Sequence, residues 1–380
     1  MKKPIFTIML LAAFIAGFAQ TKVNDSAVNY IDTSRIVIPL KIGIDSVAAI
    51  ADTSSTLIVA EDQEAFLAYN DGIELLRNGD LNNAIYKFSL AISLNTGFEK
   101  AYFNRANAYL QQQDLARAFN DFDSCRILNP ENKAVYYYLG YISFYQRNHD
   151  KAAEFFNTAV SKGYADANLY YLQGIIRFSK KDYPAAIESF TSSISLDGNN
   201  YLAYHDRGSA YRLSDKKAEA ISDYTKTIEL NPKAHQAYNN RGSVYRAQKD
   251  YTKAIADYDK AIQLKPDYYI ALNNRGITKY ENGRYKEAIE DFDDATRAKK
   301  DYAYAYNNKG LALYKLNKYE DAVEAYTKAI QYNESYGYAY LHRGSALEML
   351  RKFNEACADW KKAFDLGVEE AREYIGICNE

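Results

Sequence analysis

The sequence contains few of the residues that interrupt helices or staple a loop-rich fold. It has only 6 Pro, 1 Trp and 3 Cys in 380 residues. So few prolines permit long helices, and an odd number of cysteines is not a disulfide framework. An excess of one charge is also missing, with 47 Lys and Arg against 49 Asp and Glu. We therefore expect neither nucleic-acid binding along phosphates nor polybasic attachment to a membrane surface.

Motifs that carry catalysis or hold metals are missing as well. The chain has no HExxH, P-loop, GxSxG or CxxC motif. The run Asp291–Asp294 lacks the glycine turn and closing Glu of a calcium loop, so we interpret it as a solvated helix face. The four histidines do not converge in the repeat frame described below: His149, His205, His235 and His342. We expect no cofactor, no metal site and no enzymatic activity; an enzyme would need titratable groups that converge.

The N-terminus has the pattern of a secretory signal over residues 1–19. Lys2 and Lys3 precede an apolar stretch of about 14 residues, too short to span a bilayer comfortably, and small residues precede Gln20. An uncleaved anchor is the alternative. No later segment is apolar enough to span a membrane, so we expect an exported bacterial protein, periplasmic or secreted. Residues 20–64 are rich in Ser, Thr, Asp and Ala and are predicted to be a flexible arm.

Tyrosine is abundant, with 37 residues, and most of the chain repeats itself. Tyr238–Gly242, Leu272–Gly276 and Tyr306–Gly310 have nearly the same sequence at an offset of 34 residues. Extending this frame gives nine units over residues 65–370 without insertion or deletion. The units, called repeats 1 to 9, begin at Ala65, Glu99, Lys133, Ala167, Tyr201, His235, Tyr269, Ala303 and Gly337.

Three positions of the repeat predict close helix packing. Position 8 is Gly in every repeat except repeat 2, which has Ala106. Position 20 is always Ala, and position 24 is always aromatic. Because Gly costs a helix about 1 kcal/mol relative to Ala, its repetition predicts two helices too close for a side chain. Apolar residues at spacings of three and four, interrupted at Lys249-Asp250, predict a helix–turn–helix hairpin in each repeat.

These residues resemble the tetratricopeptide repeat family in unit length and in the Tyr, Gly, Ala and aromatic positions. The Pro near the end of the unit matches in only three repeats, at Pro130, Pro232 and Pro266. The resemblance implies an all-α, right-handed superhelical solenoid whose first helices line a concave groove. It predicts a capping helix at residues 371–380 and a scaffold for a protein or peptide partner, an extended segment or a partner domain. A glycan-binding module that uses the Tyr-rich groove is the alternative.

The resemblance also predicts which residues line the groove. Position 6 is Asn in five repeats, and an amide offers both a donor and an acceptor to a bound peptide. Simple duplication without selection for binding would also explain these asparagines. They are Asn70, Asn104, Asn240, Asn274 and Asn308.

Repeats 3 and 4 predict an apolar and aromatic patch in mid-groove. Such patches usually bind a partner, but packing at a bend or cover by the N-terminal arm would also account for it. The patch comprises Tyr137, Tyr138, Tyr141, Tyr145, Tyr171, Leu172, Ile175 and Phe178.

The remaining predictions concern cations and thiols. The Arg at position 7 is expected to lay its stem over apolar surface with a solvated head. Cys357 lies on the last repeat and Cys378 on the predicted cap, so they form a disulfide or remain two buried thiols.

Overall fold

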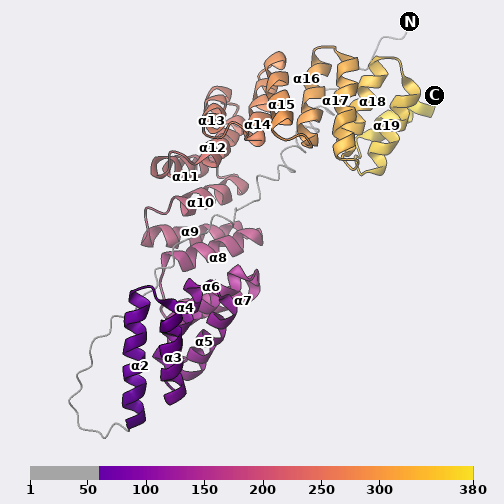
Figure 1. The fold of residues 1–380 in the computed structure, drawn as a ribbon. Helices are drawn as coiled ribbons and strands as arrows, with labels where there is room; N and C mark the ends of the chain where they lie inside the picture. Colours follow the sequence, from indigo (N-terminus) through magenta and orange to yellow (C-terminus); the bar gives the residue numbers. More distant parts are fainter. Residues whose placement is uncertain (1–59, 380) are drawn as a thin grey trace. The chain divides into compact units, whose positions relative to one another are not determined.

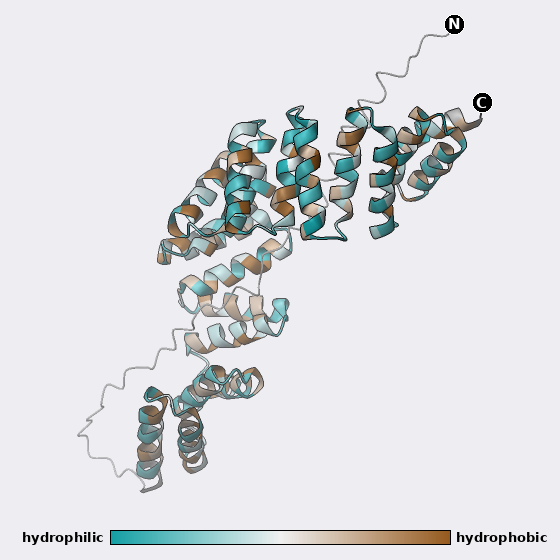
Figure 2. Ribbon diagram, turned by 45° about the horizontal axis from the view of Figure 1, so that its top comes forward, coloured by the Kyte–Doolittle hydropathy of each residue, from teal (hydrophilic) through white to brown (hydrophobic). Residues whose placement is uncertain are grey.

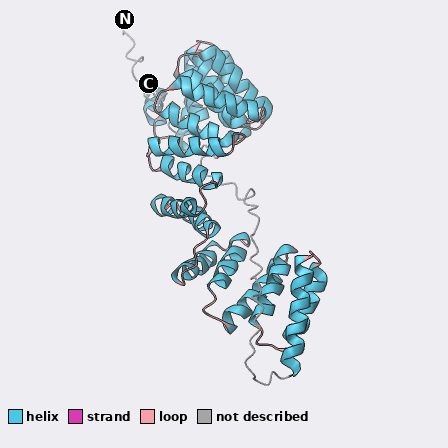
Figure 3. Ribbon diagram, turned by 90° about the vertical axis from the view of Figure 1, so that its left-hand side faces the viewer, coloured by secondary structure: helices cyan, strands magenta, loops and turns pink. Residues whose placement is uncertain are grey.

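A computed structural model describes residues 60–379, and all regular structure in that range is helical (Figure 3). Nineteen α-helices form tandem hairpins, which confirms the predicted all-α solenoid of helix–turn–helix units. The described residues divide into two compact units, 60–203 and 204–379, and α10 (Tyr201–Leu213) spans the boundary. In each unit the hairpins follow one another in chain order (Figure 1).

The first unit contains four hairpins. Its helices are α2 (Ala60–Arg77), α3 (Leu81–Leu94), α4 (Glu99–Gln111), α5 (Leu115–Leu128), α6 (Lys133–Tyr145), α7 (His149–Ser161), α8 (Ala167–Ser179) and α9 (Tyr183–Leu196). The predicted signal, residues 1–19, and residues 20–59 of the predicted arm lie outside the described residues. Residues 60–64, predicted as the end of the arm, instead form the first turn of α2.

The second unit continues the array to the C-terminus. Its helices after α10 are α11 (Lys217–Leu230), α12 (His235–Ala247), α13 (Tyr251–Leu264), α14 (Tyr269–Glu281), α15 (Tyr285–Ala298), α16 (Ala303–Lys315), α17 (Tyr319–Tyr332), α18 (Gly337–Met349), α19 (Phe353–Asp365) and α20 (Ala371–Ile375). A 3-10 turn, η2 (Gly376–Asn379), follows, so the predicted capping segment is only partly α-helical.

The glycines at position 8 lie against the aromatic rings at position 24 of the same hairpin. A Cβ built on Gly276 would lie 2.6 Å from the Phe292 ring, and one on Gly310 would lie 2.5 Å from the Tyr326 ring. Real Cβ atoms do not approach a ring so closely, so a side chain there would push the helices apart. This confirms the predicted close approach. Most helices show a hydrophobic and a hydrophilic side (Figure 2), as expected for hairpins that bury one face.

The turn between the two helices of every hairpin has a left-handed residue at position 15. Only Gly79 and Gly283 fill it with glycine. Elsewhere an L-residue adopts a positive φ, as at Lys249 with φ 63°. Several second helices then begin at an Asp cap; Asp250, for example, accepts a hydrogen bond from the Lys253 backbone N–H.

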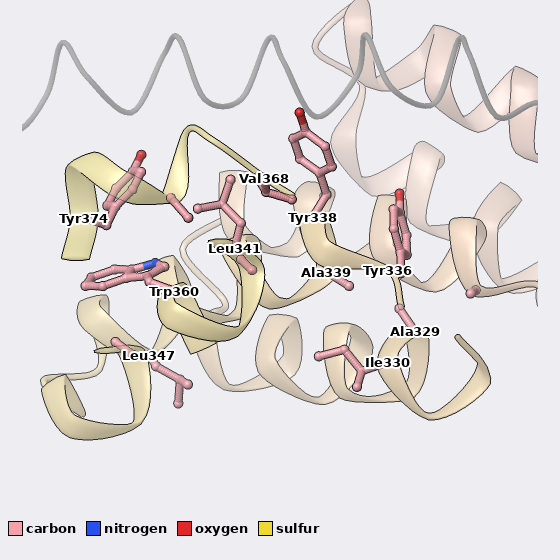
Figure 4. Close-up of a cluster of buried hydrophobic side chains, with 14 residues drawn as sticks. Ala329, Ile330, Tyr336, Tyr338, Ala339, Leu341, Leu347, Trp360, Val368 and Tyr374 are labelled. Atoms are coloured by element: carbon pink, nitrogen blue, oxygen red, sulfur yellow. The ribbon is translucent and has the colours of Figure 1, made fainter. Parts of the chain in front are cut away.

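The C-terminal end is covered by α20 and η2. Tyr374 lies over Trp360, with ring centroids 5.1 Å apart (Figure 4). A disulfide joins Cys357 on α19 to Cys378 on η2, which is one of the two alternatives that the sequence left open, with Cα atoms 5.8 Å apart. The cap therefore shields the apolar face that a further repeat would otherwise cover.

We expect Lys249→Gly to raise the free energy of unfolding by about 0.5–1 kcal/mol, because an L-residue is strained at positive φ and glycine is not. Urea unfolding followed by circular dichroism measures the change. The matched control is Gln248→Gly. Gln248 has φ −91° and ψ 0°, so glycine there should lower stability by a similar amount. Destabilisation by both substitutions would contradict the strain at position 15.

Candidate functional site

In five repeats, the residue at position 6 is hydrogen-bonded to position 5 of the repeat before it. In residues 204–379, the Asn274 amide donates to Asn239 Oδ1 at 3.0 Å. Asn308 donates to Asn273 Oδ1 at the same distance. Asn240 Nδ2 lies 3.1 Å from His205 Nε2. The asparagines of this row therefore join successive first helices, a role that the sequence did not predict for them.

The same contact occurs in residues 60–203 with a different partner. Asn104 donates to the Tyr69 hydroxyl at 3.0 Å and to the Lys100 carbonyl at 3.0 Å. Asn70, in repeat 1, has no preceding hairpin among the described residues and is exposed. Asn104, Asn274 and Asn308 are each at most 3 % exposed. Their amide donors are thus used within the protein, and a partner would have to meet their other atoms.

Several side-chain amide atoms at positions 5, 6 and 9 are buried and have no hydrogen-bond partner among the described residues. In residues 60–203 they include Asn104 Oδ1 and both side-chain polar atoms of Asn107 on α4. In residues 204–379 they include Asn307 Nδ2 and Asn308 Oδ1 on α16. Asn107 and Asn307 were not predicted as site residues, because among the asparagines only those at position 6 were singled out. Asn107 occupies position 9, as Tyr141 and Ile175 of the predicted patch do, and that was the available signal.

The predicted aromatic patch on α6 and α8 is largely interior. Tyr138 stacks on Phe122 at a centroid distance of 4.7 Å, and Tyr171 packs against Phe190 at 5.8 Å. The structure corrects the expectation of an exposed patch for six residues, all at most 5 % exposed: Tyr137, Tyr138, Tyr171, Leu172, Ile175 and Phe178. The physical reason is that these side chains pack against rings of their own or the neighbouring hairpin.

Tyr141 and Tyr145 are the accessible part of that patch. Both are half-buried on α6, and their ring centroids lie 4.6 Å apart. Burial raises the pKa of both hydroxyls above the usual value, so both are neutral at physiological pH. A neutral, half-exposed tyrosine pair offers apolar surface together with hydroxyls that donate hydrogen bonds.

The position-7 arginines do not have the predicted solvated heads. Arg241 holds Asp257 with Nε and Nη2, at 2.9 and 2.8 Å, and donates from Nη1 to Thr225 of the preceding repeat. The hydrogen bond to Asp257 raises the pKa of the Arg241 guanidinium, although burial opposes this. The same Arg–Asp pair recurs as Arg105–Asp121, Arg207–Asp223, Arg275–Asp291 and Arg343–Asp359.

This pairing also corrects the interpretation of the Asp-rich run. Asp291 is only 2 % exposed and accepts from Arg275 and Lys279, so it is not on a solvated face. Among residues 60–379, no group of three or more His, Cys, Asp or Glu is placed to hold a metal ion. Across the same range, no helix combines the length and apolar character needed to cross a bilayer.

His342 occupies position 6 in repeat 9, where it takes the place of the asparagine and can titrate. Its Nδ1 lies 2.9 Å from Asn307 Oδ1, and burial lowers its pKa to about 3. Because the unfolded histidine has a pKa near 6.5, the unfolded chain gains a proton first as pH falls. Its contribution to stability is therefore complete above about pH 6.5 and is lost progressively toward pH 3.

We expect the free energy of unfolding of the wild type to fall by on the order of 2 kcal/mol more between pH 7 and pH 5 than that of His342→Asn. In repeat 8 the residue at the same position is an asparagine, Asn308, and it makes the equivalent hydrogen bond to Asn273. Urea unfolding at both pH values measures the difference. Equal pH dependence of the two proteins would show that His342 is not held neutral.

Comparisons with known proteins agree with this geometry. Three sequence profiles of the tetratricopeptide repeat match the chain: one at residues 103–167, 144–200, 273–331 and 307–363, a second at 201–233 and a third at 235–268. The tetratricopeptide repeat domain-containing protein PYG7, chloroplastic, of Arabidopsis thaliana is 30% identical over 76 residues, which are 20% of this chain and 25% of that protein. The chain thus spans about a quarter of the length of this relative.

Solved structures resemble the chain in fold. The crystal structure of YrrB, described as a TPR protein with an unusual peptide-binding site, is 25% identical and covers 49% of this chain and 95% of its own, with a TM-score of 0.46. The crystal structure of the APC/C hetero-tetramer Cut9-Hcn1 is 15% identical and covers 83% of this chain and 76% of its own, with a TM-score of 0.51. With its 34-residue helical hairpins and these profile matches, the chain belongs to the tetratricopeptide repeat family.

Proposed function

We propose that this protein is an exported scaffold that binds an extended segment of a partner protein along its first helices. The tetratricopeptide repeat fold supports a role in protein–protein interaction. The observation that carries the proposal is the set of buried amide atoms without partners on α4 and α16. A bound peptide backbone would supply what they lack once these side chains turn toward it, since it offers donors and acceptors in any sequence.

Asn107 gives the clearest argument. It is 0 % exposed, and neither its Oδ1 nor its Nδ2 has a hydrogen-bond partner among the described residues. Leaving such a group unsatisfied costs about 1–3 kcal/mol. An apolar residue of similar volume would avoid that cost, as Ile73 and Ile175 do at the same position of other repeats. The amide of Asn107 is thus better explained by a ligand than by stability.

Tyr141, at position 9 of the next repeat, and Tyr145 extend the proposed contact along α6. Tyrosines that are rigid and half-buried are favoured anchors at protein interfaces. A glycan-binding role, the alternative expected from the many tyrosines, has no observation in its favour, because the Tyr137 and Tyr171 rings are packed in the interior. We therefore propose no glycan ligand and no catalytic role.

We expect Asn107→Leu to raise the melting temperature and to weaken partner binding about ten-fold, because the substitution removes both an unpaired amide and its bonds to the partner. A photo-crosslinking amino acid in place of Tyr145 reports binding in envelope extract. The amount of each crosslinked product is compared with and without Asn107→Leu. Circular dichroism gives the melting temperature.

The matched control is Asn104→Leu. Because Asn104 donates to Tyr69, its loss should lower the melting temperature, in contrast to Asn107→Leu. A lowered melting temperature for Asn107→Leu, or an unchanged crosslinked product, would overturn the proposed role of Asn107.

The proposed export makes a prediction about the mature chain. Disulfides persist in oxidising compartments, and the Cys357–Cys378 pair supports export on that ground. Protein isolated from the envelope should begin at Gln20 and, when denatured without reductant, show one reactive thiol, that of Cys125. Reduction should raise the count to the 3 cysteines of the sequence. An intact N-terminus, or three thiols before reduction, would contradict export by signal cleavage.

A further inference from the structure

Repeat 4 lacks the Arg–Asp pair that five other repeats share. Position 7 is Gln173 instead of Arg, and position 23 is Ser189 instead of Asp. Gln173 keeps only the contact to the preceding repeat, donating to Asn157 Oδ1 at 2.9 Å. Shorter side chains thus stand where a guanidinium and a carboxylate otherwise fill the space between hairpins.

A cleft whose lining includes charged and amide side chains lies at this place, within residues 60–203. It has a volume of about 290 Å³, with α7 and α9 as walls and α8 between them. This volume is at the small end of ligand pockets and suits a small ligand. The lining includes side chains that can form hydrogen bonds, among them Asn157, Gln173, Arg177, Glu188 and Ser189, although most of the surface exposed in the cleft is apolar.

Arg177 brings a positive charge to the cleft without a carboxylate partner. Its Nη1 donates to Ser189 Oγ at 2.9 Å and to the Ala185 carbonyl at 3.2 Å, which fixes the guanidinium. No other hydrogen bond or ion pair of Arg177 is found among residues 60–379. The position-7 arginines are each paired with the aspartate at position 23, whereas Ser189 occupies that position in repeat 4 and offers Arg177 no carboxylate.

Glu188 adds a negative charge to the same cleft. It is exposed and makes no ion pair with any described residue. A purely anionic ligand at Arg177 would be repelled by this carboxylate, and a purely cationic one by Arg177. A ligand with both charges would satisfy both side chains at once, and the amides and hydroxyls around them suit a polar molecule.

We propose that this cleft binds a small zwitterion of the α-amino-acid class. Arg177 would hold the ligand carboxylate, which would occupy the place of the missing aspartate. Glu188 would receive the ammonium group. This site lies among α7, α8 and α9 and involves neither Asn107 nor Tyr141 and Tyr145, so it does not depend on the contact proposed for those residues.

The test uses the full mature protein and the common L-amino acids, each screened at millimolar concentration by thermal shift. Isothermal titration calorimetry then compares the best ligand with its N-acetyl and its amide derivatives. We expect saturable binding of the amino acid and a loss of about ten-fold or more for each derivative, since each lacks one charge. Binding of no amino acid, or equal binding of the N-acetyl form, would overturn the proposal.

Two substitutions locate the site. Ser189→Asp restores the residue that five repeats carry at position 23, so the protein should remain folded while an internal carboxylate occupies Arg177 and abolishes binding. Thr191→Asp adds the same charge at an exposed position that does not line the cleft. It should leave affinity unchanged. Retention of binding by Ser189→Asp would place the ligand elsewhere and overturn the assignment.

Discussion

The close contact between glycine at position 8 and the ring at position 24 sets the geometry of every hairpin that has it. At Gly140, a Cβ would lie 2.7 Å from the Phe156 ring, so the two helices touch without a side chain between them. The neighbouring alanines at position 20 are fully buried and complete the fit. The aromatic ring fills the space that glycine leaves, so the two helices of the hairpin can pack as closely as side chains do in a protein interior. The same spacing determines where the polar side chains that join neighbouring repeats can lie.

Successive repeats are joined by polar side chains as well as by apolar surface. Position 7 links its own hairpin to the preceding one, as Arg343 does with Asp359 and Thr327. Position 6 links successive first helices through amides. Charged and amide pairs of this kind require defined geometry when they are buried, so they fix the register between repeats. They also leave some buried amide atoms unpaired among the described residues, and the proposed contact with a partner rests on those atoms.

Repeats 3 and 4 lack both the Arg–Asp pair and an asparagine at position 6. Leu139 and Phe155 replace the pair in repeat 3, and Gln173 with Ser189 replace it in repeat 4. Tyrosines of α6 pack where asparagines lie elsewhere. The result is a more apolar first-helix side, with Tyr141 and Tyr145 partly accessible, and the cleft among α7, α8 and α9. Several substitutions in these two repeats therefore accompany both features.

The sequence alone determined the helices, their turns, the repeat boundaries and the glycine contact, because these depend on spacings of three and four residues and on one steric rule. For Cys357 and Cys378 it left a disulfide and two buried thiols as alternatives. Only the tertiary structure decided which side chains meet. Arg241 reaches an aspartate 16 residues away, and Asn274 reaches Asn239, 35 residues back. For that reason Tyr138 and Leu172 are interior, although they occupy positions that line the groove in this family. Asn107, which no motif marks, is a buried amide without a hydrogen-bond partner among the described residues.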